Sequence, residues 1–557
     1  MLMIRKRCSI ALAGMLVVSS LLAGCGVASP MAAPQATEPQ TSGTLPIEHT
    51  AIPSPEPTLA MAAPEAEPVS LANPGFEDQK PGETPSGWTH TGTVEAVRVD
   101  EKGRSGNLRL THQAAEAYQV ETSQSVSGLA DQWYTLRGWV RSSGEQNAVY
   151  MTLKCGSEEK RVYVPPTTPG YRWLHLSVSN QVTDGQCTIS LYSDGNPDTW
   201  ANFDDIELVP GQVALSILGA DISSLKKSED LGGIYKDASG IPMDALQILK
   251  DHGLNYARLR VWVDPADGYH NKARILEMAT RLKELDIKLL VDFHYSDNWA
   301  DPGKQIKPAA WEGYDFEQLK QALYDHTFDV CNSLAAQGTP PDMVQVGNEI
   351  NSGMLWPDGH TWDPPNWDNL AQLLTAGYDA VKACSPETDV MLQIAEGGDN
   401  ELARWWFGNI TSRDVPFDVI GISYYPYWHG SLGELQYNLN DISARYDRDV
   451  IVVETAYAFT DRDNDGFPNI ADQTLAVQHY PYTPEGQRDL LRNVISIVRA
   501  VDHGRGLGVF YWDATWTAVD GNGWDNTNPA EGNAWENQAL FDFDGKVLPA
   551  LDEYLNP

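Results

Sequence analysis

Two glutamates stand where strand-like apolar runs end, and together they could cut a glycosidic bond. Glu349 closes the run Val-Gln-Val-Gly-Asn-Glu, and Glu454 closes the run Ile-Val-Val-Glu. Hydrolysis of such a bond uses two carboxyl groups, one as the acid and the other as nucleophile or base. Both residues could instead be ordinary surface or ion-paired glutamates. The Asn before Glu349 and the Trp, Tyr and His residues around both glutamates favour the catalytic interpretation.

The elements that must position this pair begin near residue 214, where strand-like runs start to alternate with helical periods. This alternation predicts a parallel sheet with crossover helices, and eight such units up to residue 557 predict a (β/α)8 TIM barrel. The expected strands end near Asp221, Arg260, His294, Glu349, Glu396, Tyr424, Glu454 and Trp512. Because the carboxyl ends of barrel strands surround one mouth, the glutamates closing strands four and seven should meet there.

The chain before residue 214 divides into three parts. Residues 1–25 have the basic, apolar and small-residue pattern of an export signal, ending in the lipobox-like run Leu-Ala-Gly-Cys. This predicts lipidation at Cys25 and a protein anchored on the outer face of a bacterial cell; a plain secretory signal is the alternative. Residues 26–66 are rich in Pro, Ala and Thr and predict a disordered linker. Residues 67–210 show short alternating runs between turn residues, which predict a β-sandwich.

The composition narrows the partners. A formal net charge of −37 excludes the nucleic-acid backbone as a partner and disfavours electrostatic docking on anionic membranes. It fits a protein that acts on a neutral ligand, touches the membrane only through its lipid anchor and is expected to be a monomer. The 18 Trp and 23 Tyr residues could supply flat faces for sugar rings, although core packing explains most of them.

Four cysteines remain in the part of the chain after the signal. Cys155 and Cys187 both fall in the predicted β-sandwich, so a disulfide between them is plausible in an exported protein. Cys331 and Cys384 fall on two predicted helices and could be buried thiols or a second bridge. No Cys–His spacing typical of a metal site occurs.

A run of motifs in the second half of the chain resembles a known enzyme family. The motifs are Gly-Ala-Asp-Ile-Ser-Ser at 219–224, Arg-Leu-Arg-Val-Trp at 258–262, Asp-Phe-His-Tyr-Ser-Asp-Asn-Trp-Ala-Asp-Pro at 292–302, Val-Gly-Asn-Glu-Ile-Asn at 346–351, Ser-Tyr-Tyr-Pro-Tyr-Trp-His-Gly at 423–430 and Glu-Thr-Ala-Tyr at 454–457. In this order they resemble the endo-β-1,4-galactanases of glycoside hydrolase family 53 over residues 215–557. The resemblance implies a (β/α)8 barrel, a retaining mechanism and pectic galactan as substrate, without an organic cofactor.

The β-rich part has a weaker resemblance of its own. Asn-Pro-Gly-Phe-Glu at 73–77 and Phe-Asp-Asp-Ile-Glu-Leu at 203–208 resemble the two ends of jelly-roll carbohydrate-binding modules, and its place beside such an enzyme suggests family 61. That resemblance implies that Glu77 and Asp205 share a structural calcium ion. The candidate residues for stacking on sugars are Trp88, Tyr118, Trp139, Tyr150, Trp173, Tyr192 and Trp200.

The chemistry assigns a role to each residue of the predicted mouth. Glu349, after Asn348, suits the acid/base, and the Asn348 amide could hold the sugar 2-hydroxyl. Glu454 is then the nucleophile, oriented by Tyr424 or Tyr425 and kept ionised by Arg260, with Arg258 as the alternative. Aromatic and imidazole side chains on the predicted loops could cover the apolar face of the sugar. They are His294, Trp299, Trp356, His429 and Trp512, with Trp512 as the main platform.

Residues 461–466, Asp-Arg-Asp-Asn-Asp-Gly, match the first half of a calcium loop, with Asp472 at its twelfth position. The loop follows the predicted seventh strand and lacks flanking helices. Asp461, Asp463 and Asp465 are the acidic candidates. By the family resemblance, Asp463, Asp465, Asn469 and the carbonyl of Phe467 are ligands of a structural calcium ion. An acidic solvent loop is the alternative.

Three positions depart from the pattern expected for the family. Gln393 stands where a His is expected, Asp513 follows Trp512 where a Glu is common, and Phe467 replaces a His of some bacterial members. Two other functions compete with the main one. One is a non-catalytic sugar-binding lipoprotein, which is usually built from two doubly wound lobes. The other is the same barrel acting on another β-1,4-glycan.

Overall fold

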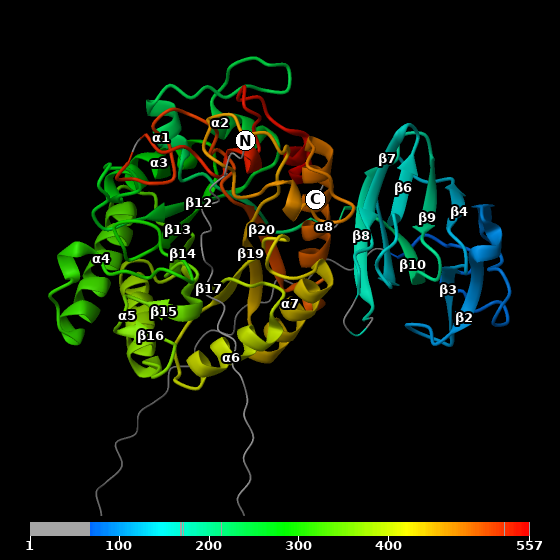
Figure 1. Cartoon of the computed structure of the whole chain (residues 1–557), viewed down its shortest axis with the longest axis horizontal. Helices are drawn as coiled ribbons and strands as arrows, with labels where there is room; N and C mark the ends of the chain where they lie inside the picture. Colours follow the sequence, from blue (N-terminus) through cyan, green and yellow to red (C-terminus); the bar gives the residue numbers. More distant parts are fainter. Residues whose placement is uncertain (1–66, 168–169, 171, 213, 529, 556–557) are drawn as a thin grey trace, which may run out of the picture. The chain divides into compact units, whose positions relative to one another are not determined.

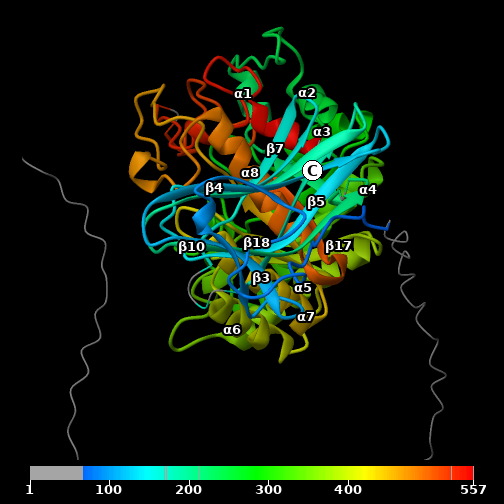
Figure 2. The same cartoon turned by 90° about the vertical axis from the view of Figure 1, so that its right-hand side faces the viewer.

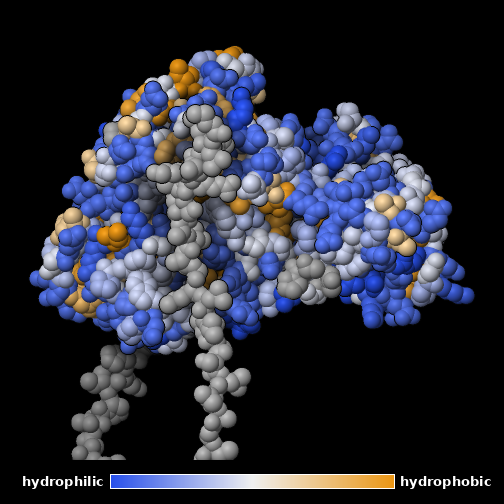
Figure 3. All heavy atoms as spheres, viewed as in Figure 1, coloured by the Kyte–Doolittle hydropathy of each residue, from blue (hydrophilic) through white to orange (hydrophobic). Residues whose placement is uncertain are grey.

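The computed structural model describes residues 67–555 except 168, 169, 171, 213 and 529. The predicted export signal, lipidated Cys25 and linker at 26–66 therefore lie outside the described residues. Among the described helices, none is both long and apolar enough to cross a membrane. On the face shown in Figure 3, hydrophilic residues cover most of the surface and hydrophobic ones occur in small groups.

Ten antiparallel strands form the β-rich part, coloured blue to cyan in Figures 1 and 2. Their order is β1-β4-β9-β6-β7 in one five-stranded sheet and β2-β3-β10-β5-β8 in the other. The strands are β1 (Thr89–Gly92), β2 (Val97–Glu101), β3 (Leu108–Gln113), β4 (Tyr118–Ser127), β5 (Trp133–Ser142), β6 (Ala148–Cys155), β7 (Glu158–Tyr163), β8 (Leu174–Gln181), β9 (Gln186–Gly195) and β10 (Trp200–Pro210).

Alternation of buried and part-exposed residues shapes these strands, as in β9, whose pattern follows a period of two. The predicted disulfide is confirmed: Cys155 in β6 faces Cys187 in β9, with an S–S distance of 2.00 Å. Cys331 and Cys384 are free thiols, so the second bridge left open by the sequence is not formed in this structure.

Eight parallel strands close the predicted barrel in the order of the chain. They are β11 (Ile217–Asp221), β12 (Tyr256–Val261), β13 (Lys288–Phe293), β14 (Met343–Val346), β17 (Asp389–Ile394), β18 (Val419–Ser423), β19 (Asp449–Thr455) and β20 (Gly506–Tyr511). All eight end within three residues of the positions expected from the sequence. A two-stranded sheet, β15 (Gly353–Met354) and β16 (Gly359–His360), lies in the loop after β14.

The helices between these strands surround the barrel, as Figure 1 shows for α4 and α5 in green and for α7 and α8 in yellow to orange. They are α1 (Leu225–Asp230), α2 (Ala245–Asp251), α3 (Lys272–Glu284), α4 (Phe316–Ala336), α5 (Trp367–Cys384), α6 (Asn400–Thr411), α7 (Leu432–Tyr446) and α8 (Pro484–Arg499). Two start with a capping box: Asp315 with Gln318 before α4, and Ser431 with Glu434 before α7.

Apolar side chains from every barrel strand form a separate buried cluster, which includes Ile217, Tyr256, Leu290, Met343, Met391, Val419, Ile451, Val453 and Phe510. Most of these residues come from the first half or the middle of their strands, and together they fill one end of the barrel. Gly219 allows this packing, because a Cβ atom there would lie 2.4 Å from the Phe510 ring. The polar residues that follow the strands are left at the other end, where barrel enzymes carry their chemistry.

Candidate active site

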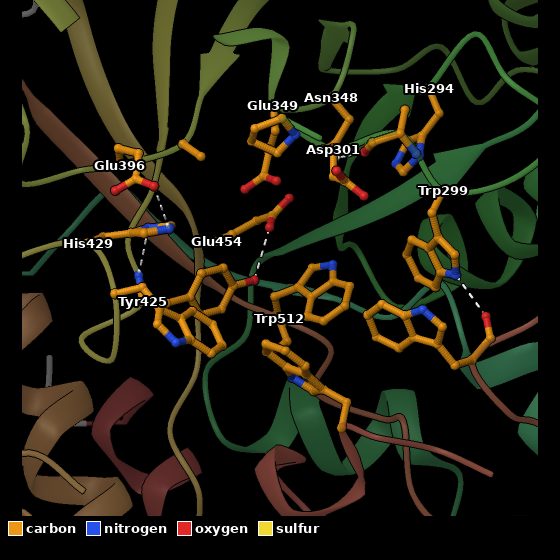
Figure 4. Close-up of a pocket in the computed structure, with 16 residues that line it drawn as sticks. His294, Trp299, Asp301, Asn348, Glu349, Glu396, Tyr425, His429, Glu454 and Trp512 are labelled. Carbon is orange, nitrogen blue, oxygen red and sulfur yellow. Dashed lines mark hydrogen bonds and ion pairs between the residues drawn. The ribbon is translucent and has the colours of Figure 1, made fainter. Parts of the chain in front are cut away.

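The two predicted catalytic glutamates meet in one cavity of about 230 Å³. Glu349 comes three residues after β14, and Glu454 is the next-to-last residue of β19. Figure 4 shows their carboxyl groups pointing toward one another, above the indole of Trp512. The prediction that strands four and seven bring these residues together agrees with the structure.

A buried guanidinium and a phenol hold Glu454. Arg258 Nη2 lies 2.8 Å from Glu454 Oε1, and the Tyr425 hydroxyl donates to Oε2 at 3.0 Å. Burial raises the pKa of Glu454, and the nearby Arg258 charge opposes that rise. Burial and the charge of Glu454 raise the pKa of Tyr425 as well, so the phenol keeps its proton and stays a donor. Both partners favour an ionised, fixed carboxylate, which is the state that a nucleophile needs.

The prediction that Arg260 pairs with Glu454 is wrong, and its alternative Arg258 is right. Both arginines point into the barrel, because they are two residues apart on one strand. Arg258 also pairs with Asp221 and Asp292, at 3.0 and 2.9 Å. Arg260 instead lies 3.4 Å from Asp513 and 4.2 Å from the centre of the Trp299 ring. It therefore supports the cavity wall from behind and does not line the cavity.

Asp513, the residue that replaces the expected Glu after Trp512, belongs to this support. Its Oδ1 accepts a hydrogen bond from the Ser224 hydroxyl at 2.9 Å. Burial and the neighbouring Asp221 raise its pKa to about 7. Asp513 is fully buried and does not line the cavity, so this departure from the family pattern changes the packing behind the sugar site rather than the sugar site itself.

Glu349 has the surroundings of an acid that keeps its proton. Burial and the charge of Glu454 raise its pKa well above its usual range, and Asp301 adds to the rise. Its backbone is in the left-handed region, with φ 46°, where a residue with a side chain is strained. The backbone N–H donates to Oε1 of Gln393. Strain held by the surroundings at this position is typical of a functional residue.

Asn348 is fixed on both sides of its amide. Its Oδ1 accepts from Arg258 Nη2 at 2.7 Å, and its Nδ2 donates to the carbonyl of Ala300 at 2.8 Å. The side chain lines the cavity and has little freedom to rotate. This leaves one amide hydrogen of Asn348 for a substrate hydroxyl, as expected from the sequence.

The structure brings most of the predicted sugar-contacting residues to the cavity, but not all. His294, Trp299, Tyr425, His429 and Trp512 line it (Figure 4). Two other predictions are wrong. The Tyr424 side chain is buried in the core, and its hydroxyl donates to the carbonyl of Gly430 rather than to Glu454. Trp356 packs edge-to-face on Trp362 in the loop after β14 and does not line the cavity.

Other lining residues escaped the sequence analysis. Trp524 and Trp535 come from the long loop after β20, where no periodic pattern marks them. Asp301 and Trp428 lie inside motifs that were recognised, and Glu396 was expected only as a strand end. The position of Glu396 just after a strand could therefore have identified it as a cavity residue. Nothing in the sequence distinguished Trp524 and Trp535 from core residues.

Residues 217–554 match the model of the family described as "Glycosyl hydrolase family 53". That match covers well over half of the chain. The chain belongs to glycosyl hydrolase family 53. The resemblance inferred from the motifs is confirmed, and membership makes the protein a glycoside hydrolase.

Relatives of this family 53 chain agree with that assignment. An "Arabinogalactan endo-beta-1,4-galactanase" of Thermothelomyces thermophilus is 34% identical over 61% of this chain and 99% of its own. An "Endo-beta-1,4-galactanase" of Bacillus subtilis is 33% identical over 63% of this chain and 87% of its own. A solved "Ignisphaera aggregans GH53 catalytic domain" is 40% identical, covers 61% of this chain and 95% of that one, and has a TM-score of 0.58.

The acidic loop after β19 forms a cluster in this family 53 barrel, with one unexpected member. Carboxylate oxygens of Asp463, Asp465 and Glu536 lie within 4.8 Å of one another. Asp461 is not part of the cluster, which corrects that prediction. Glu536, which comes from the segment after β20, was missed because it is 71 residues further along the chain than Asp465.

Two buried oxygen atoms at this loop have no hydrogen-bond partner, Oδ1 of Asn469 and Oε2 of Glu536. Burial raises the pKa of Glu536 to about 7, and the charges of Asp465 and Asp463 add to this rise. Hard oxygen donors that crowd together and lack partners suit a divalent cation such as calcium. The residues present therefore fit the ion that the family resemblance implies.

The prediction that seven aromatic residues of the β-rich part stack on sugars is wrong for two of them. Trp88 and Tyr118 are buried and belong to the core, whereas Trp139, Tyr150, Trp173, Tyr192 and Trp200 are partly exposed. Protein donors already serve the carboxylates of Glu77 and Asp205: Asn107 and Leu108 donate to Glu77, and Ser105 donates to Asp205. The calcium ion expected there stays a prediction without a structural observation behind it.

Proposed function

We propose that this family 53 protein is an endo-β-1,4-galactanase that hydrolyses internal β-1,4-D-galactosidic bonds of pectic galactan, the backbone of type I arabinogalactan. The observation that carries the proposal is the pair of facing glutamates in a cavity walled by indole rings. Trp299, Trp512, Trp524 and Trp535 supply those rings. Indoles match the apolar C–H face of galactose, and the names of the relatives agree on the polymer.

In the proposed mechanism Glu454 attacks the anomeric carbon while Glu349 protonates the leaving oxygen. The Arg258 guanidinium and the Tyr425 hydroxyl hold Glu454 ionised and oriented for the attack. Forming the glycosyl ester removes the negative charge of Glu454, so the main charge that raises the pKa of Glu349 disappears. Glu349 then becomes a base and takes a proton from the incoming water. The anomeric configuration is retained, because two inversions occur.

A panel of purified polysaccharides tests this function. Linear β-1,4-galactan should release short galacto-oligosaccharides early, because an endo-enzyme cuts inside the chain. Xylan and mannan should release none. Faster release of sugar from xylan or mannan would show that the protein is a glycoside hydrolase with a substrate other than galactan. The absence of released sugar from every polymer would favour the sugar-binding lipoprotein instead.

We further propose that a structural calcium ion binds at Asp463, Asp465 and Glu536, with Asn469 and the Phe467 carbonyl completing its oxygen ligands. The orphaned oxygens of Asn469 and Glu536 support this. The cation would neutralise three neighbouring carboxylates and join the loop after β19 to the segment after β20. It would take no part in bond cleavage, because these residues do not line the cavity with the catalytic pair.

Chelation of calcium is expected to lower the melting temperature of the enzyme. A ligand at a hundredfold excess over its dissociation constant stabilises a protein by about 2.7 kcal/mol, and chelation removes that contribution. Glu536→Gln should abolish the difference between calcium and chelator in a thermal melt. Asp461→Asn is the matched control, since Asp461 lies outside the cluster, and should keep the full difference. Equal melting temperatures of the unaltered enzyme with and without calcium would contradict the site.

For the β-rich part we propose a jelly-roll carbohydrate-binding module that resembles family 61. Partly exposed aromatic residues occur on both sheets, among them Tyr150 on β6 and Trp139 on β5. The full-length Glu454→Ala protein should migrate slowly in gels containing galactan. Adding Tyr150→Ala should restore its mobility if the sheet that contains β6 binds galactan. Adding Trp139→Ala should restore it if the sheet that contains β5 does. Unchanged retardation in both would mean that the catalytic cavity alone holds the polymer.

The anchor stays a proposal from the sequence. We propose that the chain is exported and lipidated at Cys25, which would hold the enzyme on the outer face of a bacterial cell. Cys25→Ala protein should then leave the detergent-rich phase in a partition assay. A correctly cleaved Cys25→Ala protein that stays with membranes would contradict lipidation.

A further inference from the structure

Two buried polar residues next to Glu349 have no role so far, Gln393 at the end of β17 and Ser423 at the end of β18. Both have no exposed surface. Gln393 is also the position where this chain departs from the His expected for its family. Gln393 accepts a hydrogen bond from the backbone N–H of Glu349, and Ser423 lowers the pKa of the Glu349 carboxyl group.

The hydrogen bonds around Gln393 leave only one orientation for its amide. Arg258 Nε can only donate, so the 3.3 Å contact with Gln345 identifies the Gln345 atom there as oxygen. Gln345 Nε2 then donates to Gln393 Oε1 at 3.0 Å. The backbone N–H of Glu349 donates to the same Gln393 oxygen. The other end of the Gln393 amide, Nε2, must therefore face β18.

That amide in turn fixes the hydroxyl of Ser423. Gln393 Nε2 donates to Ser423 Oγ at 2.6 Å, so the Ser423 oxygen is an acceptor in this bond. A serine hydroxyl has a single hydrogen, which remains free to be donated. Donation of this hydrogen to the Glu349 carboxyl group would lower the pKa of Glu349, which is the direction in which Ser423 acts on it. The direction of donation therefore runs from Arg258 through two amides to the Ser423 hydroxyl, whose hydrogen is left for Glu349.

We propose that Gln393 and Ser423 are positioning residues for the acid/base: Gln393 holds the strained backbone of Glu349 and turns the Ser423 hydrogen toward its carboxylate. This inference rests on the proposed role of Glu349. A hydroxyl donor stabilises the ionised carboxylate more than the protonated one. It therefore works against burial and the charge of Glu454, and helps Glu349 to act as a base in the second step.

Other groups that face Glu349 act in both directions. Glu454 and Asp301 favour its protonated form, and Arg258 favours its ionised form. The remaining ionisable side chains of the cavity are His294, Glu396, Tyr425 and His429. Burial lowers the pKa of His429 to about 4, so this imidazole is neutral near pH 7. None of these groups is changed by the substitutions below.

The alkaline limb of the kcat/KM profile on soluble galactan tests the proposal, because it reports the acid of the free enzyme. Ser423→Ala removes the donor, so the limb should move to higher pH by about one unit. Ser423→Thr, which keeps a hydroxyl, should restore the original profile. Thr455→Val is the matched control: it removes a buried hydroxyl that has no partner, and should leave the limb in place.

A double substitution tests the direction of donation. A leucine at position 393 can neither donate nor accept a hydrogen bond, so in Gln393→Leu nothing fixes the Ser423 hydrogen toward Glu349. Ser423→Ala added to Gln393→Leu should then move the limb by less than Ser423→Ala alone. A limb unmoved by Ser423→Ala, or an equal shift by Ser423→Ala with and without Gln393→Leu, would overturn the proposal. Failure of the galactanase function would look different, since the unaltered enzyme would then release nothing from galactan.

Discussion

Glu454→Ala is expected to lower the rate of galactan hydrolysis by roughly four to six orders of magnitude. The substitution removes the atom that bonds to the anomeric carbon, so no glycosyl-enzyme can form. The loss should be the same for polymer and for aryl β-galactosides, because a better leaving group does not replace a nucleophile. Initial rates on both substrates, with circular dichroism to verify folding, measure it.

Added azide can enter the space that Glu454 leaves and attack the sugar directly. A single displacement inverts the anomeric centre, so Glu454→Ala with azide should give the α-configured glycosyl azide. Glu396→Gln is a useful comparison, because it removes the charge of a third carboxylate in the same cavity. Its rate should fall far less, and azide should change nothing. Full activity of Glu454→Ala would remove Glu454 from the mechanism.

Glu349→Ala is expected to divide substrates by their leaving group. Galactan needs a proton on the departing oxygen, so its hydrolysis should fall by roughly two to four orders of magnitude. An activated aryl galactoside needs little protonation, so its first step should survive. The second step lacks its base, and a covalent intermediate on Glu454 should accumulate, visible by mass spectrometry after a burst of the phenol.

Azide should rescue the second step of Glu349→Ala, since an anion needs no base. Attack on the intermediate from the opposite face gives the β-configured glycosyl azide. The two variants therefore yield opposite anomers, and the pair of products assigns the roles. An α product from Glu349→Ala together with a β product from Glu454→Ala would show that the acid/base and the nucleophile have been exchanged.

The barrel strands were predictable because each is buried on both faces and followed by polar residues. Such strands read as continuous apolar runs, and β19, with the run Asp-Val-Ile-Val-Val-Glu-Thr, is an example. The catalytic pair followed from the same signal, since Glu349 and Glu454 interrupt or end these runs. Pattern and chemistry pointed to the same residues.

The sequence could not predict how far along the barrel axis each inward-facing side chain lies. Arg258 and Arg260 share one face of β12, and only the stagger of the closed barrel decides which one reaches Glu454. Tyr424 and Tyr425 pose the same problem at a strand end. Another reason explains why the sequence analysis missed Trp524, Trp535 and Glu536. The segment that carries them has no long helix or strand, so no hydrophobic periodicity predicts where it lies.

The cluster around Arg258 has a consequence for how the barrel folds. This guanidinium is almost fully buried and contacts carboxylates on β11, β13 and β19. Arg258 keeps two partners, Asp221 and Asp292, without the last strands, whereas Glu454 is itself buried and depends on this shared cation. An unpaired buried charge is strongly unfavourable, so β19 is stabilised in place only once Glu454 reaches Arg258 on β12. We therefore expect these two strands, far apart along the chain, to join cooperatively.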